Sequence, residues 1–342
     1  MSHWCAVAPL PVGRLNLCVA AAESSGTLYA VGGYSFPPPD YKSSVLQYSA
    51  DDDHWSSAAN MSISRDSFGC GVVEASDGSS WLYVVGGESA EYPFILSSVE
   101  RLNLTAGARA TWAPVASLHE VRQGHAVAVL DGVLYAAGGL SPNSTSYRRT
   151  LASVEAYDAK ADAWTLLPPM AHARYYHGLT AYGACLYAVG GLSQSQHVLV
   201  SVESYDPRVG RWLELAPLPE PRQRLALVAM PPVPVGRGGR SISNEGDGSG
   251  IYAMGGCRAA AQSPCGSLLS SVIRLTPTPQ PASATSGREG KLQGSWVAVP
   301  SLPTANVWFG GAAVGRRLFA VGGGMFYASN ATYMLDPTMN FA

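Results

Sequence analysis

Apolar residues recur along the chain in short runs, and six of these runs end in two consecutive glycines. They read TLYAVGG, WLYVVGG, VLYAAGG, CLYAVGG, GIYAMGG and RLFAVGG, with the doublets 54, 52, 52, 65 and 67 residues apart. Short apolar runs bounded by glycine are typical of buried strands. Recurrence at a period near 50 residues indicates a repeat architecture. The pattern therefore predicts six copies of one β unit.

Each unit is predicted to hold four strands. A small and apolar run precedes each doublet strand, as in residues 124–130 before the turn Asp131-Gly132, which favours a hairpin. A strand of the form S-V-E-x-Y follows, with the sequences SVLQY, SVERL, SVEAY, SVESY and SVIRL. A fourth strand is marked by a tryptophan, at Trp55, Trp112, Trp164, Trp212 and Trp296.

The sixth unit lacks a tryptophan strand at its own end, and the missing strand is found at the start of the chain. HWCAVAPLP at 3–11 matches WAPVASL, WTLLPPM and WLELAPLP, so Trp4 supplies it. Chain ends that share one repeat predict a closed ring, which leaves no open blade edge. We therefore expect one all-β domain over 1–342, a six-bladed propeller with units at 14–64, 65–121, 122–173, 174–221, 222–305 and 306–342, the last completed by 1–13.

Composition agrees with many short strands and excludes several functions. The chain has 37 glycines, 24 prolines and 13% charged residues, about half the usual charged share. A net charge of −2 disfavours nucleic acids and anionic membranes as partners, and no apolar run reaches the ~18 residues of a membrane span. Two stretches of the fifth unit, 235–250 and 276–295, are rich in Gly, Ser and Pro and predict mobile loops.

Cysteines and the N-terminus predict a cytoplasmic protein, with the nucleus as an alternative. The six cysteines show no CxxC or CxxH spacing, so reduced thiols are expected, and only Cys257 and Cys265 share a loop in which a disulfide is conceivable. The first residues lack the basic and apolar regions of a signal peptide. The four N-x-S/T sequons, at Asn60, Asn103, Asn143 and Asn330, are accordingly interpreted as accidental.

The repeated residues resemble a known family. Double glycine, Glu/Tyr strand and Trp strand in this spacing are similar to the kelch repeat, and RQGHAVAVLDGVLYAAGG and SVESYDPRVGRW resemble the propellers of the BTB-kelch substrate adaptors of cullin ubiquitin ligases. The resemblance covers nearly the whole chain and implies protein binding. Two features depart from those adaptors: no BTB or BACK segment precedes the repeats, and the fifth unit is stretched by its inserts.

One polar residue recurs four positions after the Met or Leu that closes each tryptophan strand. These channel-ring residues are Arg14, Arg65, Arg122, Arg174, Arg222 and Asn306. Guanidiniums around a channel could bind an acidic peptide, because arginine grips carboxylates with two hydrogen bonds. Alternatively each satisfies carbonyls or a buried glutamate such as Glu100, Glu155 or Glu203. Recurrence in step with the fold favours this structural role.

Residues that differ between units at equivalent positions are better candidates for function, because the fold does not dictate them. Two positions beyond the ring residues stand Asn16, Ser67, Gly124, Tyr176, Arg224 and Trp308. In the adaptors that the chain resembles, these positions and the loops after the double glycines face the partner. Those loops bring Tyr34, Phe36, Tyr41, Tyr92, Phe94, Tyr147, Arg148, Arg149, Gln194, Gln196, His197, Phe326 and Tyr327. Tyr, Trp and Arg dominate interface hot spots, although loop aromatics can also pack on their own blades.

No catalytic or metal-binding constellation stands out. The histidines form no HxH or HExxH pair, and His125 and His177, at matching repeat positions, are interpreted as strand-start residues rather than metal ligands. There is no G-x-S-x-G elbow, and Asp66 is the clearest acid near the predicted channel. No cofactor is expected. We therefore expect a non-catalytic module that binds a protein or peptide on its loop face, in the setting of a cullin-type ubiquitin ligase whose cullin and BTB parts come from another chain. A sugar mutarotase or epimerase is the alternative.

Overall fold

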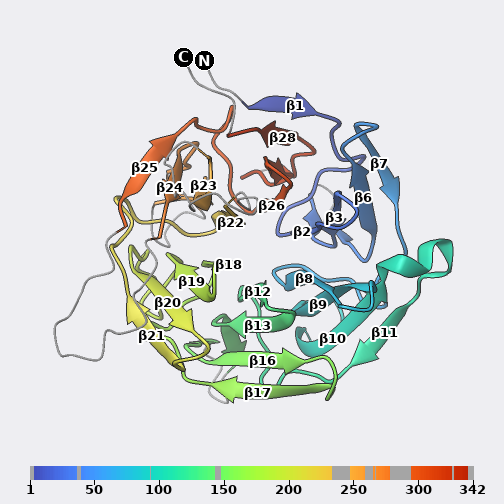
Figure 1. Ribbon diagram of the computed structural model, residues 1–342, viewed down its shortest axis with the longest axis horizontal. Coiled ribbons are helices and arrows are strands. Elements are labelled where there is room, and N and C mark those ends of the chain that lie inside the picture. The colour runs from blue at the N-terminus through green and yellow to red at the C-terminus, as the bar shows by residue number, and fades with distance from the viewer. Residues whose placement is uncertain are drawn as a thin grey trace, which may run out of the picture.

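The computed structural model describes residues 4–36, 40–92, 94–142, 148–232, 247–258, 265, 267–277, 294–325 and 327–337. Six four-stranded antiparallel sheets, the blades, surround a central channel (Figure 1). In five of the six blades consecutive strands pair with each other, and the chain runs from the innermost strand outwards. The prediction of a six-bladed all-β propeller is confirmed.

The first three blades follow each other along the chain. Blade 1 holds β2 (Cys18–Ala22), β3 (Thr27–Val31), β6 (Val45–Ser49) and β7 (His54–Ser57). Blade 2 holds β8 (Gly69–Glu74), β9 (Ser80–Glu88), β10 (Ile95–Asn103) and β11 (Trp112–Val115). Blade 3 holds β12 (Ala126–Leu130), β13 (Val133–Ala137), β16 (Val154–Asp158) and β17 (Ala163–Leu167).

The remaining blades complete the ring. Blade 4 holds β18 (Gly178–Tyr182), β19 (Cys185–Val189), β20 (Val202–Asp206) and β21 (Arg211–Glu214). Blade 5 holds β22 (Ala226–Met230), β23 (Gly250–Met254), β24 (Val272–Leu275) and β25 (Trp296–Val299). Blade 6 holds β26 (Gly310–Val314), β27 (Arg317–Val321), β28 (Thr332–Leu335) and β1 (Cys5–Val7).

The ring is closed where β1 lies beside β28 in Figure 1. Strand β1 pairs antiparallel with β28, with Cys5 opposite Met334 and Val7 opposite Thr332. The indole Nε1 of Trp4 donates to the carbonyl of Pro300, in the linker from blade 5 (2.9 Å). The predicted closure by the N-terminal tryptophan strand is confirmed.

Tryptophans of the outer strands hold neighbouring blades together. In blades 1 to 4 the indole Nε1 donates to a carbonyl in the linker that arrives from the preceding blade, from Trp55 to Ala8 (2.9 Å), Trp112 to Ala59 (2.8 Å), Trp164 to Ala116 (2.9 Å) and Trp212 to Pro168 (3.0 Å). The Nε1 of Trp296 in blade 5 has no such partner among the described residues. Apolar clusters also cross blade boundaries, as where Val228 and Tyr252 of blade 5 meet Phe309 and Leu318 of blade 6. The core is thus a set of wedges between blades.

The glycine doublets mark where the backbones of adjacent blades touch. A Cβ on Gly138 would lie 2.4 Å from the carbonyl oxygen of Arg174, at the start of the next blade. A Cβ on Gly139 would lie 2.9 Å from the carbonyl oxygen of Gln123 in its own blade. Both glycines also have positive φ, 65° and 102°. Any side chain here would force the blades apart.

Some elements lie outside the four-strand pattern. Two small hairpins extend the connections after the glycine doublets, β4 (Tyr34–Ser35) with β5 (Asp40–Tyr41) and β14 (Leu140–Pro142) with β15 (Arg148–Thr150). A 3-10 helix, η1 (Leu104–Arg109), joins β10 to β11. The predicted loop inserts fall between β22 and β23 and between β24 and β25, and residues 233–246 and 278–293 within them lie outside the described residues.

The expectation of reduced thiols was wrong for four of the six cysteines. Cys18 and Cys70 form a disulfide, with Cα atoms 5.9 Å apart, and so do Cys257 and Cys265. The first pair is 52 residues apart in sequence, about one repeat, and β2 and β8 are the innermost strands of adjacent blades. Repetition therefore places two distant thiols side by side, which the search for short cysteine spacings could not detect.

Candidate functional site

The channel-ring residues are buried inside the blades. Arg122 is representative: Nη1 donates to the carbonyls of Gly138 (2.9 Å) and Ser153 (3.2 Å), and Nη2 donates to the carboxylate of Glu155 (2.7 Å). Arg14, Arg65, Arg174 and Arg222 bond in the same way to Gly32, Gly86, Gly190 and Gly255, and the Asn306 amide donates to Gly322. These contacts tie each incoming linker to its blade. They match the structural role rather than capture of an acidic peptide.

Two positions further on, the chain turns sharply at the centre of the ring. The residues there, which we call the mouth residues, all have left-handed backbone: Asn16 (φ 50°), Ser67 (50°), Gly124 (60°), Tyr176 (51°), Arg224 (52°) and Trp308 (56°). Five of the six backbone amides donate to the carbonyl of the previous mouth residue: Asn16 to Trp308, Ser67 to Asn16, Gly124 to Ser67, Tyr176 to Gly124 and Arg224 to Tyr176 (2.7–3.3 Å). Only one of the six is glycine, so side chains occupy a conformation that disfavours them.

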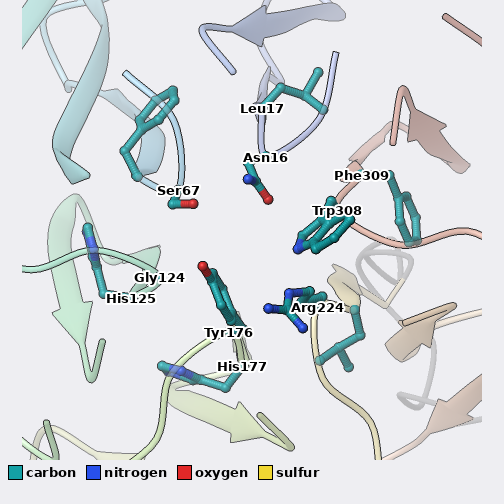
Figure 2. A pocket seen from close by; sticks show the side chains of 12 residues that line it. Asn16, Leu17, Ser67, Gly124, His125, Tyr176, His177, Arg224, Trp308 and Phe309 are labelled. Carbon is teal, nitrogen blue, oxygen red and sulfur yellow. The ribbon is translucent and has the colours of Figure 1, made fainter. Parts of the chain in front are cut away.

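The mouth residues converge on one cavity of about 130 Å³ at the end of the channel. Figure 2 shows Asn16, Ser67, Tyr176 and Arg224 directed toward its centre. Its lining also includes the residues one position further along the chain, Leu17, Phe68, His125, His177, Leu225 and Phe309. The structure therefore brings together the six positions that stand two residues beyond the ring residues, including Asn16, Ser67, Tyr176, Arg224 and Trp308 of the predicted partner-binding residues.

Arg224 is held between two aromatic rings of the mouth. Its guanidinium carbon lies 4.3 Å from the ring centroid of Tyr176 and 4.9 Å from that of Trp308. Its Nη1 donates to the side-chain oxygen of Gln223 (2.7 Å). Cation–π contacts of this kind orient a guanidinium without neutralising its charge. The mouth therefore presents a positioned cation beside aromatic surface.

His125 and His177 lie in the floor of the cavity as neutral side chains. Burial, with the charge of Arg122, lowers the pKa of His125 to about 3, and burial, with the charge of Arg174, holds the pKa of His177 well below its usual value. A neutral imidazole could ligate a metal, but no group of three His, Cys, Asp or Glu side chains among the described residues is placed to hold one. We interpret both as packing residues.

Asp66 lies beside the mouth between blades 1 and 2. It is 7% exposed, and its Oδ2 accepts a hydrogen bond from the Asn16 amide (3.1 Å). Burial raises the pKa of Asp66 to about 7, the Asn16 hydrogen bond opposes this, and the nearby charge of Glu88 adds to it. This carboxyl is therefore close to half-ionised at neutral pH, unlike an ordinary aspartate.

The loops around the mouth form a rim with two different sectors. Over blades 6, 1 and 2 it carries exposed aromatic side chains, Phe36 (46% exposed), Tyr92 (87%), Phe94 (59%) and Tyr327 (71%), with Tyr34 and Tyr41 half-buried behind them. Over blades 3 and 4 it is polar, with Arg148 and Arg149 exposed on β15 and His197 bonded to Ser195 (3.0 Å). Tyr147 and Phe326 lie outside the described residues.

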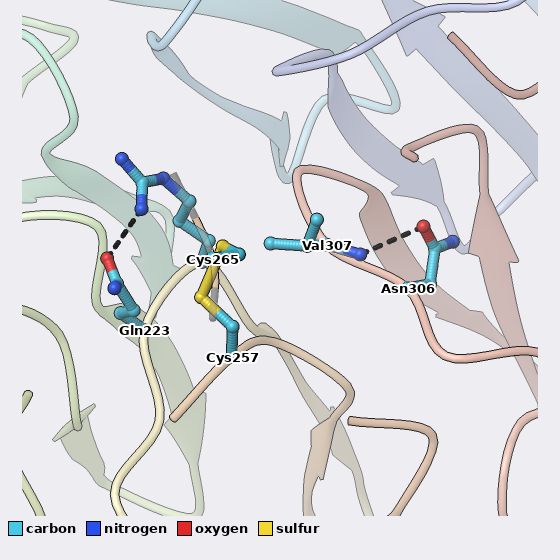
Figure 3. The surroundings of a disulfide bond; sticks show 6 residues. Gln223, Cys257, Cys265, Asn306 and Val307 are labelled. Atoms are coloured by element: carbon cyan, nitrogen blue, oxygen red, sulfur yellow. Dashed lines mark hydrogen bonds between the residues drawn. A yellow bond between two sulfur atoms is a disulfide. The ribbon is translucent and has the colours of Figure 1, made fainter. Parts of the chain in front are cut away.

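Two features of the site were missed by reading the sequence. Sequence reasoning found His125 and His177 at matching repeat positions but missed the other floor residues, Leu17, Phe68, Leu225 and Phe309, which stand at the same three-residue distance from their ring residues. The Cys257–Cys265 disulfide packs with Val307 beside Trp308 (Figure 3). The sequence does not show that this disulfide packs against the mouth, because the contact with Val307 and Trp308 depends on the fold. Among the helices in the described part of the chain, none has the length and apolar character to cross a membrane.

Comparisons with known proteins agree with this architecture. The family model described as the kelch motif matches residues 16–62, 122–171 and 173–219. Kelch-like protein 36 of Bos taurus is 30% identical over 197 residues, which are 56% of this chain and 29% of that protein. Kelch-like protein 34 of Homo sapiens is 34% identical over 191 residues, 55% of this chain and 27% of that protein.

A more distant relative also matches. Beta-scruin of Limulus polyphemus is 26% identical over 182 residues, 49% of this chain and 18% of that protein. The chain thus spans less than a third of the length of each of these curated relatives. The chain therefore carries kelch motifs within a six-bladed propeller of four-stranded blades, and over about half of its length it is similar to the Kelch-like proteins.

Proposed function

We propose that this propeller captures a protein or peptide partner across the mouth and its rim, as the substrate-recognition part of a cullin-type ubiquitin ligase in the cytoplasm. The observation that carries the proposal is the mouth itself. Six residues that the repeat leaves free to vary converge on one cavity, and the five that are not glycine adopt a left-handed conformation that glycine would adopt at lower cost.

The chemistry of the mouth and rim suits a protein partner. Aromatic and arginine side chains supply most of the binding energy in protein interfaces, and here Tyr176, Arg224 and Trp308 stand in contact at the centre. Exposed rings such as Tyr92 and Tyr327 surround them. A cavity of about 130 Å³ admits one side chain rather than a drug-sized ligand, since the pockets that bind such ligands measure roughly 300–1,000 Å³.

Affinity purification from the native cell with mass spectrometry tests the proposal. The mouth variant carries Tyr176→Asn, Arg224→Asn and Trp308→Asn, because asparagine tolerates the left-handed conformation better than alanine. The control variant carries Val209→Asn in the turn between β20 and β21, at the opposite end of the strands, where Val209 is exposed. Both must keep the melting temperature of the wild type.

Partners lost from the mouth variant but kept by the control variant would support an interaction surface at the mouth. A cullin or a BTB protein retained by all three proteins would support the ligase setting. Identical partner sets from wild type and mouth variant would overturn the proposal.

A sugar mutarotase or epimerase is a second candidate, favoured by one observation. A carboxyl with a pKa of about 7, as in Asp66, suits proton transfer at neutral pH. An NMR assay of anomer exchange in glucose and galactose tests it. Acceleration by the wild type that is lost in Asp66→Asn would favour the enzyme, and exchange at the uncatalysed rate would exclude it for these sugars.

A further inference from the structure

One pair of repeat positions next to the mouth is occupied differently in blade 2. The residue after each ring residue forms a backbone bridge with the residue after the glycine doublet. The bridged pairs are Leu15 with Tyr34, Asp66 with Glu88, Gln123 with Leu140, Tyr175 with Leu192 and Gln223 with Cys257, and in blade 6 the amide of Gly324 donates to Val307 (2.9 Å). Two carboxylates face each other in blade 2 and no charge occurs in the other pairs. The fold therefore does not require them.

These carboxylates lack a counter-ion within the described structure. Asp66 is 93% buried, and its Oδ1 has no hydrogen-bond partner among the described residues. Glu88 is half-buried. In the side-chain orientation that satisfies both of its amide atoms, Gln123 donates from its nitrogen to the Glu88 carboxylate and accepts with its oxygen from the Arg148 guanidinium. Neither carboxylate forms an ion pair with any described side chain. Buried negative charge without a partner is costly and favours an external cation.

Aromatic rings adjoin the carboxylates. Tyr34 and Tyr41 stand on the β4–β5 hairpin in edge contact, with centroids 5.2 Å apart. Burial first, and then the charges of Asp66 and Glu88, raise the pKa of Tyr41 to about 12, so its hydroxyl lies in their field. Tyr92 and Phe94 follow Glu88 in the same connection and are exposed. Aromatic faces attract organic cations.

We propose that Asp66, Glu88, Tyr34 and Tyr41 form the subsite that accepts a lysine or arginine side chain of the partner, an inference that rests on the proposed function. A divalent metal fits less well, because Ca²⁺ takes six to eight oxygen ligands and two carboxylates with flanking phenol rings do not supply them. The cation enters at the half-buried Glu88, and the buried Asp66 attracts it through space. The aromatic rim over blades 6, 1 and 2 covers the aliphatic part of the chain that carries the charge.

Binding at this subsite is coupled to pH. Asp66 has a pKa of about 7 because it is buried, and the groups that face it or its neighbours are Asn16, Glu88, Tyr34, Tyr41 and Arg148. A bound cation favours ionised Asp66, so the affinity rises as pH increases. Since the ionised fraction grows about tenfold from pH 6 to pH 8, the affinity grows by up to the same factor.

A peptide array probed with the purified protein tests the subsite. Wild type, Glu88→Gln and Asp66→Asn are compared with the control Glu91→Gln, an exposed acid in the connection after β9. Wild type and control are expected to select peptides enriched in lysine or arginine. Selected peptides synthesised singly should bind Glu88→Gln about tenfold more weakly. Asp66→Asn should lose the rise in affinity between pH 6 and pH 8.

A second test reverses the charges of Glu88 and of the peptide, and it does not depend on whether the Asp66→Asn variant folds correctly. Glu88→Lys should bind a selected peptide whose basic residue is changed to glutamate better than the original peptide. If wild type binds peptides without basic enrichment, or if Glu88→Gln and Glu91→Gln bind alike, the subsite is wrong and the proposed function is untouched. If wild type binds no peptide on the array and its partners do not depend on the mouth, both proposals are overturned.

Discussion

The ring layer and the mouth layer of this propeller stand two residues apart in every repeat, yet they behave as different regions. The ring layer is nearly uniform, with five arginines and one asparagine, all buried and bonded to glycine carbonyls. In the mouth layer all six residues differ, although they share one backbone conformation. Uniformity indicates a residue that each blade needs in order to fold, and variety over a common backbone is the pattern that the proposed partner-binding role of the mouth predicts.

Removing a ring arginine should have the largest effect on stability. Arg122→Ala leaves the buried Glu155 without its main partner, and we expect a loss of about 3–5 kcal/mol in the free energy of unfolding. Urea denaturation measures this. Arg14→Ala is the comparison, because Arg14 bonds to Ser44 and no carboxylate is left unpaired. Equal losses from both would show that the ion pair is not what matters in this layer.

Asp66→Asn should stabilise the protein, in contrast to the ring changes. The pKa of Asp66 is raised from 3.8 to about 7 in the folded state, so folding is opposed once pH rises above the unfolded value. The stability that is lost by ionising the buried carboxyl increases up to about pH 7 and is constant above it, where it amounts to about 2–4 kcal/mol. Urea melts at pH 5 and pH 8 should show a gain for Asp66→Asn that is larger at pH 8. A loss of stability at pH 8 would contradict the burial argument.

The Cys18–Cys70 disulfide joins the innermost strands of blades 1 and 2 across 52 residues of sequence. Cys70→Ser should lower the free energy of unfolding by about 2–4 kcal/mol under oxidising conditions. The difference from wild type should shrink in excess reductant, and thiol titration of the unfolded wild type should count the bridged cysteines. An unchanged difference in reductant would assign the loss to packing of the sulfur atoms instead.

Gly124→Ala should disturb the mouth while leaving the blades intact. A Cβ at position 124 would lie 2.9 Å from Cε1 of Tyr176, and the φ of 60° adds a strain of about 1–2 kcal/mol. We expect this modest loss of stability together with a displaced Tyr176 ring, visible in fluorescence or NMR, and weaker partner binding. Gly183→Ala is matched, since it has φ of 59° with nothing near its Cβ. It should cost similar stability and leave binding unaffected.

The smallest effect on stability is expected within the mouth. Arg224→Gln removes two cation–π contacts at the end of the channel, worth below about 2 kcal/mol. The melting temperature of Arg224→Gln should therefore be well above that of Arg122→Ala, while the affinity of Arg224→Gln for the partner should be lower than that of the wild type. A loss as large as that of Arg122→Ala would erase the distinction between the two layers.

Much of this architecture could be predicted because the repeat records it six times. The glycine doublets, the tryptophan strands and the return of Trp4 to the last blade all follow from periodic contacts between neighbouring backbones. The mouth positions could be found for the same reason, since they keep a fixed distance from Arg122 and its equivalents. Periodicity encodes backbone geometry, and these features depend on backbone geometry alone.

The rest depends on particular side chains meeting across blades. Cys18 and Cys70 pair because two inner strands lie in contact. The pKa of Asp66 is raised mainly because the fold buries this carboxyl, and the charge of Glu88, its partner in a backbone bridge, adds to the shift. The η1 helix and the small hairpins arise in connections that differ from blade to blade. These features have no sequence pattern that recurs from repeat to repeat, so they cannot be predicted from the sequence until the fold places the residues in contact.

The pairing of β1 with β28 has a consequence in time. Met334, which lies opposite Cys5, is added to the growing chain 329 residues after Cys5. At translation rates of about 5–20 residues per second this interval lasts roughly 16 to 66 s. The first strand therefore remains without its neighbour throughout synthesis of the intervening blades, and blade 6 is completed only after translation of β28. The nascent chain is accessible to chaperones and to incorrect strand pairing for that whole interval. A ribosome that stalled before β28 would release a chain in which β1 has no strand to pair with, so the ring could not close.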